Sequence, residues 1–94
     1  MKFYSYILVR TCSACPEQYD LFDENQNQVA YLRLRHGYFY CDSPDVGYDR
    51  VYEANTFGDG IFHDDERHIH LKNAIEAVHK FLGRKGEFVY QIVN

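Results

Sequence analysis

The chain has 94 residues, a formal net charge of −4 and an aromatic fraction of 17%. This length suits one domain over residues 1–94, and the hydrophobic fraction of 46% excludes a disordered chain. The acidic balance makes double-stranded DNA an unfavourable partner, and no apolar stretch approaches the roughly 20 residues that span a membrane. Three cysteines, Cys12, Cys15 and Cys41, leave one thiol unpaired under any single disulfide, which indicates a reducing, cytoplasmic location.

The first part of the chain predicts two strands. Phe3–Val9 is apolar on both faces, which is typical of a central strand. Gln18–Asp23 follows a loop of small residues that ends in proline. The polar turn Glu24–Asn27 then reverses the chain, and a four-residue loop would place Phe22 opposite Val29.

Residues 30–41 predict a β-hairpin whose register follows from its turn. His36 and Gly37 form a two-residue turn, because glycine accepts a positive φ and histidine tolerates one. Continuing the ladder into the preceding strand places Asp20 opposite Tyr31. The hairpin itself sets four pairs opposite each other: Arg35 and Tyr38, Leu34 and Phe39, Arg33 and Tyr40, Leu32 and Cys41.

The remaining chain predicts a strand, a helix and a final strand. A turn over residues 43–47 leads to a strand around Arg50–Ala54, and a glycine-containing loop leads to a helix over Asp65–Leu82. Asp64 is the expected N-cap of this helix, and Glu87–Val93 alternates as the last strand. The apolar stripe of the helix comprises Leu71, Ala74, Ile75, Val78 and Leu82.

The predicted order is β-β-β-β-β-α-β. Short connections between successive strands favour an α+β domain with an antiparallel meander sheet of five to six strands. The single amphipathic helix then packs on one face of this sheet. The opposite face has no cover from within the chain.

The uncovered face is the main candidate site. Arginine grips anionic groups through two hydrogen bonds, and arginine and tyrosine are enriched at protein interfaces. Alternatively, cross-strand Tyr–Arg pairs simply stabilise an exposed sheet, with the two aspartates neutralising the arginines. Tyr4 and Tyr6 are expected at its margin. The predicted partner-binding residues are Asp20, Tyr31, Arg33, Arg35, Tyr38, Tyr40 and Asp42.

These residues favour a non-enzymatic binding module that contacts a protein partner, or a second copy through this face or an exposed edge. An alternative is sequestration of a nucleotide or a single-stranded nucleic acid, since aromatic rings stack on bases and guanidiniums bind phosphates. Neither hypothesis requires a cofactor.

A metal-dependent enzyme is a further alternative. Cys12 and Cys15 have the spacing of a zinc knuckle, which His36 or Cys41 would have to complete. No second closely spaced pair follows them, and Cys41 lies on the core face in the predicted register. Ordinary reduced thiols are therefore the expected state, and no metal is assigned.

The segment His63–His70 is also dense in potential metal ligands and acid–base groups. Helical geometry disperses them, because only Glu66 and His70 share a face at i, i+4. His68 falls on the apolar stripe and is expected to be partly buried.

Three segments, Cys15–Asp23, Val29–Arg35 and Gly58–Phe62, together resemble small bacterial and phage-type single-domain proteins without an established activity. The resemblance implies a compact domain that acts by binding. Examples of such action are blocking a host protein or sequestering a small nucleotide.

Overall fold

The computed structural model describes residues 3–12, 14 and 16–94. Within these residues the predicted order of six strands and one helix is confirmed. The elements are β1 Phe3–Arg10, β2 Glu17–Phe22, β3 Gln28–Arg35, β4 Tyr38–Ser43, β5 Asp49–Asn55, α1 Asp64–Phe81 and β6 Glu87–Val93.

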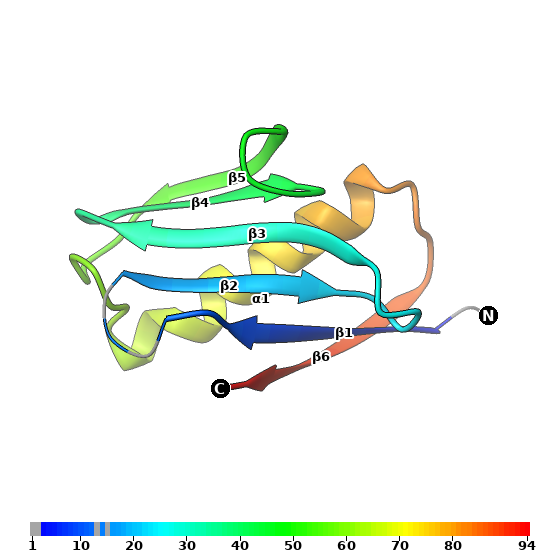
Figure 1. Cartoon of the computed structure of the whole chain (residues 1–94), viewed down its shortest axis with the longest axis horizontal. Coiled ribbons are helices and arrows are strands. Elements are labelled where there is room, and N and C mark those ends of the chain that lie inside the picture. Colours follow the sequence, from blue (N-terminus) through cyan, green and yellow to red (C-terminus); the bar gives the residue numbers. More distant parts are fainter. Residues whose placement is uncertain (1–2, 13, 15) are drawn as a thin grey trace.

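All six strands join one sheet in the order β5-β4-β3-β2-β1-β6 (Figure 1). The first five strands form the predicted antiparallel meander, but the prediction of a wholly antiparallel sheet is wrong. β6 runs parallel to β1, with Tyr6 opposite Tyr90. The reason is the connection: the segment from β5 through α1 to β6 leads the chain from one edge of the sheet to the other, and such a crossover reverses the direction that a hairpin would give.

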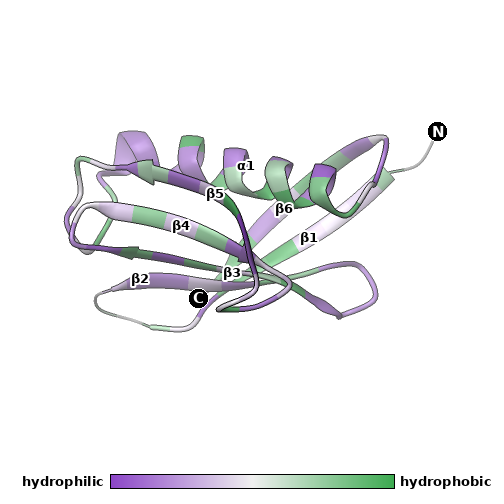
Figure 2. Cartoon of the chain, turned by 90° about the horizontal axis from the view of Figure 1, so that it is seen from above, coloured by the Kyte–Doolittle hydropathy of each residue, from purple (hydrophilic) through white to green (hydrophobic). Residues whose placement is uncertain are grey.

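Helix α1 covers one face of the sheet, and the other face carries no helix within the described residues (Figure 2). Leu71, Ala74, Ile75 and Val78 are fully buried against the sheet, as their spacing predicts. Leu82 lies past the end of the helix and is 36% exposed. No helix in the described part of the chain is long and apolar enough to cross a membrane.

The start of α1 differs from the prediction. The N-cap is His63 rather than Asp64, because the Glu66 carboxylate accepts the His63 backbone N–H at 3.0 Å. His68 is exposed, not partly buried. At this end the helix packs through the side that carries Glu66, Arg67 and His70, and His68 points away from that contact.

The predicted hairpin register is confirmed at all four pairs, and His36 and Gly37 form the turn with φ of 55° and 73°. Asp20 lies opposite Tyr31, also as predicted. Phe22, however, pairs with Gln28 rather than Val29, because a bulge shifts the β2–β3 register at its end. The buried core between sheet and helix is apolar, and it includes Leu32, Leu34, Phe39 and Cys41.

Candidate binding face

Five predicted site residues lie together on the face opposite α1. We call Tyr31, Arg33, Arg35, Tyr38 and Tyr40 the Arg/Tyr face. The ring centroids of Tyr38 and Tyr40 are 5.9 Å apart, and those of Tyr31 and Tyr40 are 6.3 Å apart. The alternation of β3 and β4 explains this gathering, since their other residues fill the core.

Tyr4 and Tyr6 do not join this face. Both lie on the helix-covered side, where the Tyr6 hydroxyl is 2.7 Å from His79 Nδ1 and the Tyr4 ring packs edge-on against the His79 ring. Burial raises the pKa of Tyr6, although Arg84 acts in the opposite direction. The apolar character of both faces of β1 left its orientation ambiguous in the sequence.

Asp42 is bound by an arginine that the sequence did not single out. Its carboxylate accepts the Arg50 Nε–H at 2.8 Å, and its side chain is almost fully buried. The Arg50 guanidinium also lies over the Tyr40 ring at 4.1 Å from its centroid. Asp42 lies opposite Arg50 in the β4–β5 ladder. This pairing could not be predicted, because the geometry of the connecting loop is not evident from the sequence and a bulge beyond Cys41 shifts the register.

Asp20 does not neutralise the arginines either. Its nearest hydrogen-bond partner is the Gln28 side-chain amide at 3.4 Å. Burial, helped by the negative charge of Asp45, raises the pKa of Asp20. The predicted internal neutralisation of Arg33 and Arg35 by aspartates is therefore wrong.

Arg33 and Arg35 form no ion pair, although Asp59 lines the same cavity. All 14 acidic residues of the chain lie in the described ranges, and none forms an ion pair with either arginine. Within those ranges the buried Arg33 Nε also has no hydrogen-bond partner. A buried guanidinium N–H without an acceptor is costly.

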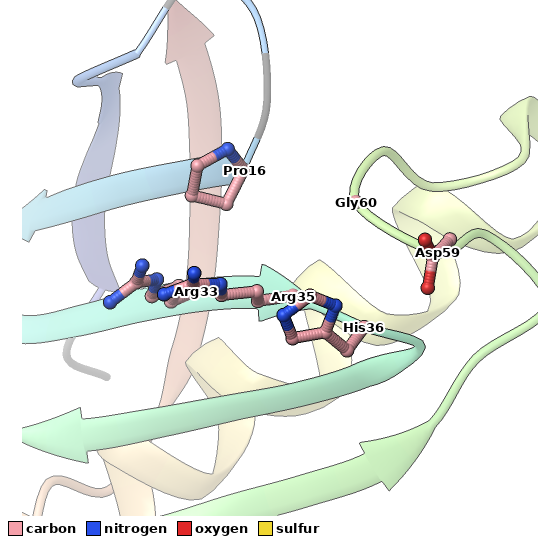
Figure 3. A pocket seen from close by; sticks show the side chains of 6 residues that line it. All are labelled: Pro16, Arg33, Arg35, His36, Asp59 and Gly60. Carbon is pink, nitrogen blue, oxygen red and sulfur yellow. The ribbon is translucent and has the colours of Figure 1, made fainter.

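The two arginines line a shallow cavity of about 310 Å³ at the hairpin end of the face. Figure 3 shows them extending along β3, with Pro16 on one side and the loop of Asp59 and Gly60 on another. His36 completes the lining. A second hollow of about 320 Å³ continues from these arginines over the tyrosines of β4.

The loop over residues 56–62, which forms one wall of this cavity, is held in place by a buried carboxylate. Glu66 accepts the backbone N–H groups of Phe57 and Gly58 at 3.0 and 2.8 Å, in addition to that of His63. Burial alone would raise the pKa of Glu66, but these three donors outweigh it and lower the pKa. The sequence singled out Glu66 only for sharing a helix face with His70, and its contacts to the loop could not be predicted.

A second buried carboxylate ties the same loop to β2. Glu17 accepts the Phe62 backbone N–H at 3.0 Å, the Arg67 Nε–H at 2.8 Å and the hydroxyl of Tyr19. Burial again opposes ionisation, and the donors led by Arg67 outweigh it, so the pKa of Glu17 is lowered. The Gly37 N–H also donates to the Asp59 carbonyl at 2.6 Å. The cavity wall is therefore rigidly connected to the hairpin.

The predicted metal ligands are not brought together. Among the described residues no three His, Cys, Asp or Glu side chains gather in a metal-binding geometry. Glu66 and His70 do share a face, with the carboxylate 3.7 Å from His70 Nε2. Cys41 is fully buried, as predicted, and Cys12 is half-buried; Cys15 lies outside the described residues.

Comparison of the chain with protein-family models, with curated proteins and with solved structures gives no match. The resemblance to phage-type proteins therefore stays a prediction.

Proposed function

We propose that this protein is a non-enzymatic binding module whose Arg/Tyr face takes an acidic segment of a protein partner. The observation that carries the proposal is the pair Arg33 and Arg35, which form no ion pair within the described chain. Guanidiniums bind carboxylates through two parallel hydrogen bonds, and both side chains line the cavity.

The tyrosines favour a protein over a nucleobase. Arg50 already occupies one side of the Tyr40 ring, and Tyr38 and Tyr31 pack beside it. A base would have to displace these contacts in order to stack. The rings offer instead a broad amphipathic surface of the kind that protein partners bury.

The loop beside the cavity adds apolar anchors. Phe57 is 86% exposed and Ile61 is 44% exposed, although the backbone of this loop is fixed by Glu66. Exposed aromatic side chains on a rigid backbone lose little conformational entropy on binding. The phage-type resemblance would make the partner a host protein met in the cytoplasm.

The experiment compares binding of three fluorescent probes by anisotropy: a glutamate-rich peptide, a lysine-rich peptide of equal length, and an oligothymidylate. We expect the acidic peptide to bind, and Arg33→Gln with Arg35→Gln to weaken it at least about tenfold. The control Lys80→Gln with Lys85→Gln removes the same charge from two exposed positions elsewhere and should leave the affinity unchanged.

Two outcomes would contradict the proposal. Tighter binding of the oligothymidylate, abolished by the same double substitution, would establish the nucleic-acid alternative. Equal weakening by the arginine and lysine variants would show that the acidic peptide responds only to net charge.

A further inference from the structure

The two edges of the sheet differ in how they are protected against pairing with another chain. β5 carries Asp49, Arg50 and Glu53, and a bulge interrupts its pairing with β4. Charges and bulges are the usual devices that stop an edge strand from adding a further strand. β6 has one charge, Glu87 at its start, and residues 88–93 are uncharged.

We infer that β6 pairs antiparallel with β6 of a second copy of this chain about a two-fold axis, so that two sheets join into one. The outer side of β6 has no strand beside it in the described chain, which leaves its backbone groups available for such a ladder. Because the proposed surface lies on β6, it is separate from the Arg/Tyr face on β3 and β4.

The side chains of β6 fit this pairing. Val89, Ile92 and Val93 are 49%, 41% and 42% exposed in the single chain. A ladder centred on Tyr90 places Phe88 of one protomer beside Ile92 of its partner on the helix side, and the two-fold axis repeats the contact. The apolar side chains are then covered at two symmetry-related places. The two Glu87 side chains lie at opposite ends of the ladder, so they do not repel each other.

The charges beside β6 favour a second copy over an unrelated peptide. Lys72 and Glu76 of α1 line a groove of about 480 Å³ together with Phe88 and Tyr90. A two-fold axis at β6 turns the helix around, so Lys72 of one protomer lies toward Glu76 of its partner, and Glu76 toward Lys72. An unrelated extended peptide would bring no such helix.

Sedimentation equilibrium of the whole chain tests the inference, with native mass spectrometry to identify the subunits. We expect a homodimer, whose dissociation constant rises at least about tenfold in Val89→Lys with Gln91→Lys. Both positions are exposed, and the substitutions bring new positive charges together across the two-fold axis. The control Tyr48→Lys with Asn55→Lys adds the same charge at the β5 edge and should still dimerise.

Amide hydrogen exchange locates the contact: outward-facing amides of residues 88–93 should exchange more slowly as protein concentration rises. A monomer at about 100 μM, far above the micromolar range of weak dimers, would overturn the inference. A dimer whose β6 amides exchange as fast as in the monomer, and which the β6 lysine substitutions do not weaken, would also overturn it. So would a complex in which a different chain binds β6. Arg33→Gln with Arg35→Gln should dimerise normally, so failure of the proposed function is distinguishable.

Discussion

Two groups of charged side chains, one behind the loop over residues 56–62 and one on the hairpin, are partnered in opposite ways. On the loop side, Glu17 and Glu66 are buried, and each accepts three or more hydrogen bonds. On the hairpin side, Arg33 and Arg35 form no ion pair, and the Arg33 Nε has no acceptor within the described residues. Burial requires the first group to be satisfied for the chain to fold.

This difference separates charged side chains that stabilise the fold from charged side chains that can bind a partner. Removing a donor or acceptor from the loop side leaves a buried partner unsatisfied, which destabilises the fold. Removing an arginine from the hairpin side breaks no ion pair, so its effect should fall on binding. Substitutions on the two sides therefore test whether this separation is real.

The largest loss of stability is expected for Glu17→Gln. The substitution removes the charge that faces Arg67 and should lower the free energy of unfolding by about 3 kcal/mol. Urea unfolding followed by circular dichroism measures it. Glu53→Gln, which neutralises an exposed carboxylate on β5, should cost far less; equal losses would remove the special role of the loop side.

A smaller loss, about 2 kcal/mol, is expected for Gly58→Ala. A Cβ at this position would lie 1.9 Å from the Ile61 carbonyl oxygen, so the loop backbone must move away from Glu66. Thermal unfolding measures the change. The control Gly83→Ala meets open space and carries only the strain of its positive φ of 71°; a larger loss there would contradict the close-packing argument.

Acid should weaken the fold through its buried carboxylates. The folded protein lowers the pKa of Glu17 and Glu66, and also that of Asp23, where burial is outweighed by Arg84 and two backbone donors. The unfolded chain therefore binds more protons, and this contribution to stability is lost as pH falls below the ordinary values of 4.5 and 3.8. The raised pKa of Asp20 acts in the opposite direction but is outnumbered.

Melting temperatures measured from pH 7 down to about pH 3 check this expectation. The decline should be shallower in Glu17→Gln, because one of the three groups no longer titrates. A melting temperature that stays constant through the acid range would show that the carboxylates are not stabilised by folding.

The smallest effect on stability is expected for Arg33→Gln with Arg35→Gln, within about 0.5 kcal/mol of the unaltered chain. Glutamine keeps much of each side-chain stem, and no ion pair is broken. The same urea titration measures it. A loss as large as that of Glu17→Gln would mean that both groups of charged side chains stabilise the fold.

Much of the sheet could be predicted because strand alternation and turn chemistry act locally. The positive φ of His36 and Gly37 fixed the hairpin, and every cross-strand pair followed from it. The parallel pairing of β6 could not be predicted, since it depends on where α1 leads the chain. Periodicity also misplaced His68, because the first turns of the helix pack through the side of Glu66, Arg67 and His70.

The candidate site was predicted only in its hairpin half. Alternation placed Arg33, Arg35 and the tyrosines on one face, but the opposing wall comes from Asp59 and Gly60, which tertiary contacts bring in. The expected neutralisation of Arg33 and Arg35 by the aspartates was wrong for the same reason. Asp42 is neutralised by Arg50 from a strand whose register a bulge displaces.

The parallel pairing of β1 with β6 has a consequence for how the chain folds. Its partners, such as Tyr6 and Tyr90, come from opposite ends of the chain, and closing so long a loop is entropically costly. The neighbouring strands of the meander are joined by short turns and form quickly. During synthesis β1 emerges before the other five strands. One of its two neighbours, β6, is made last, so β1 is the first strand to be synthesised and the last to be paired on both sides.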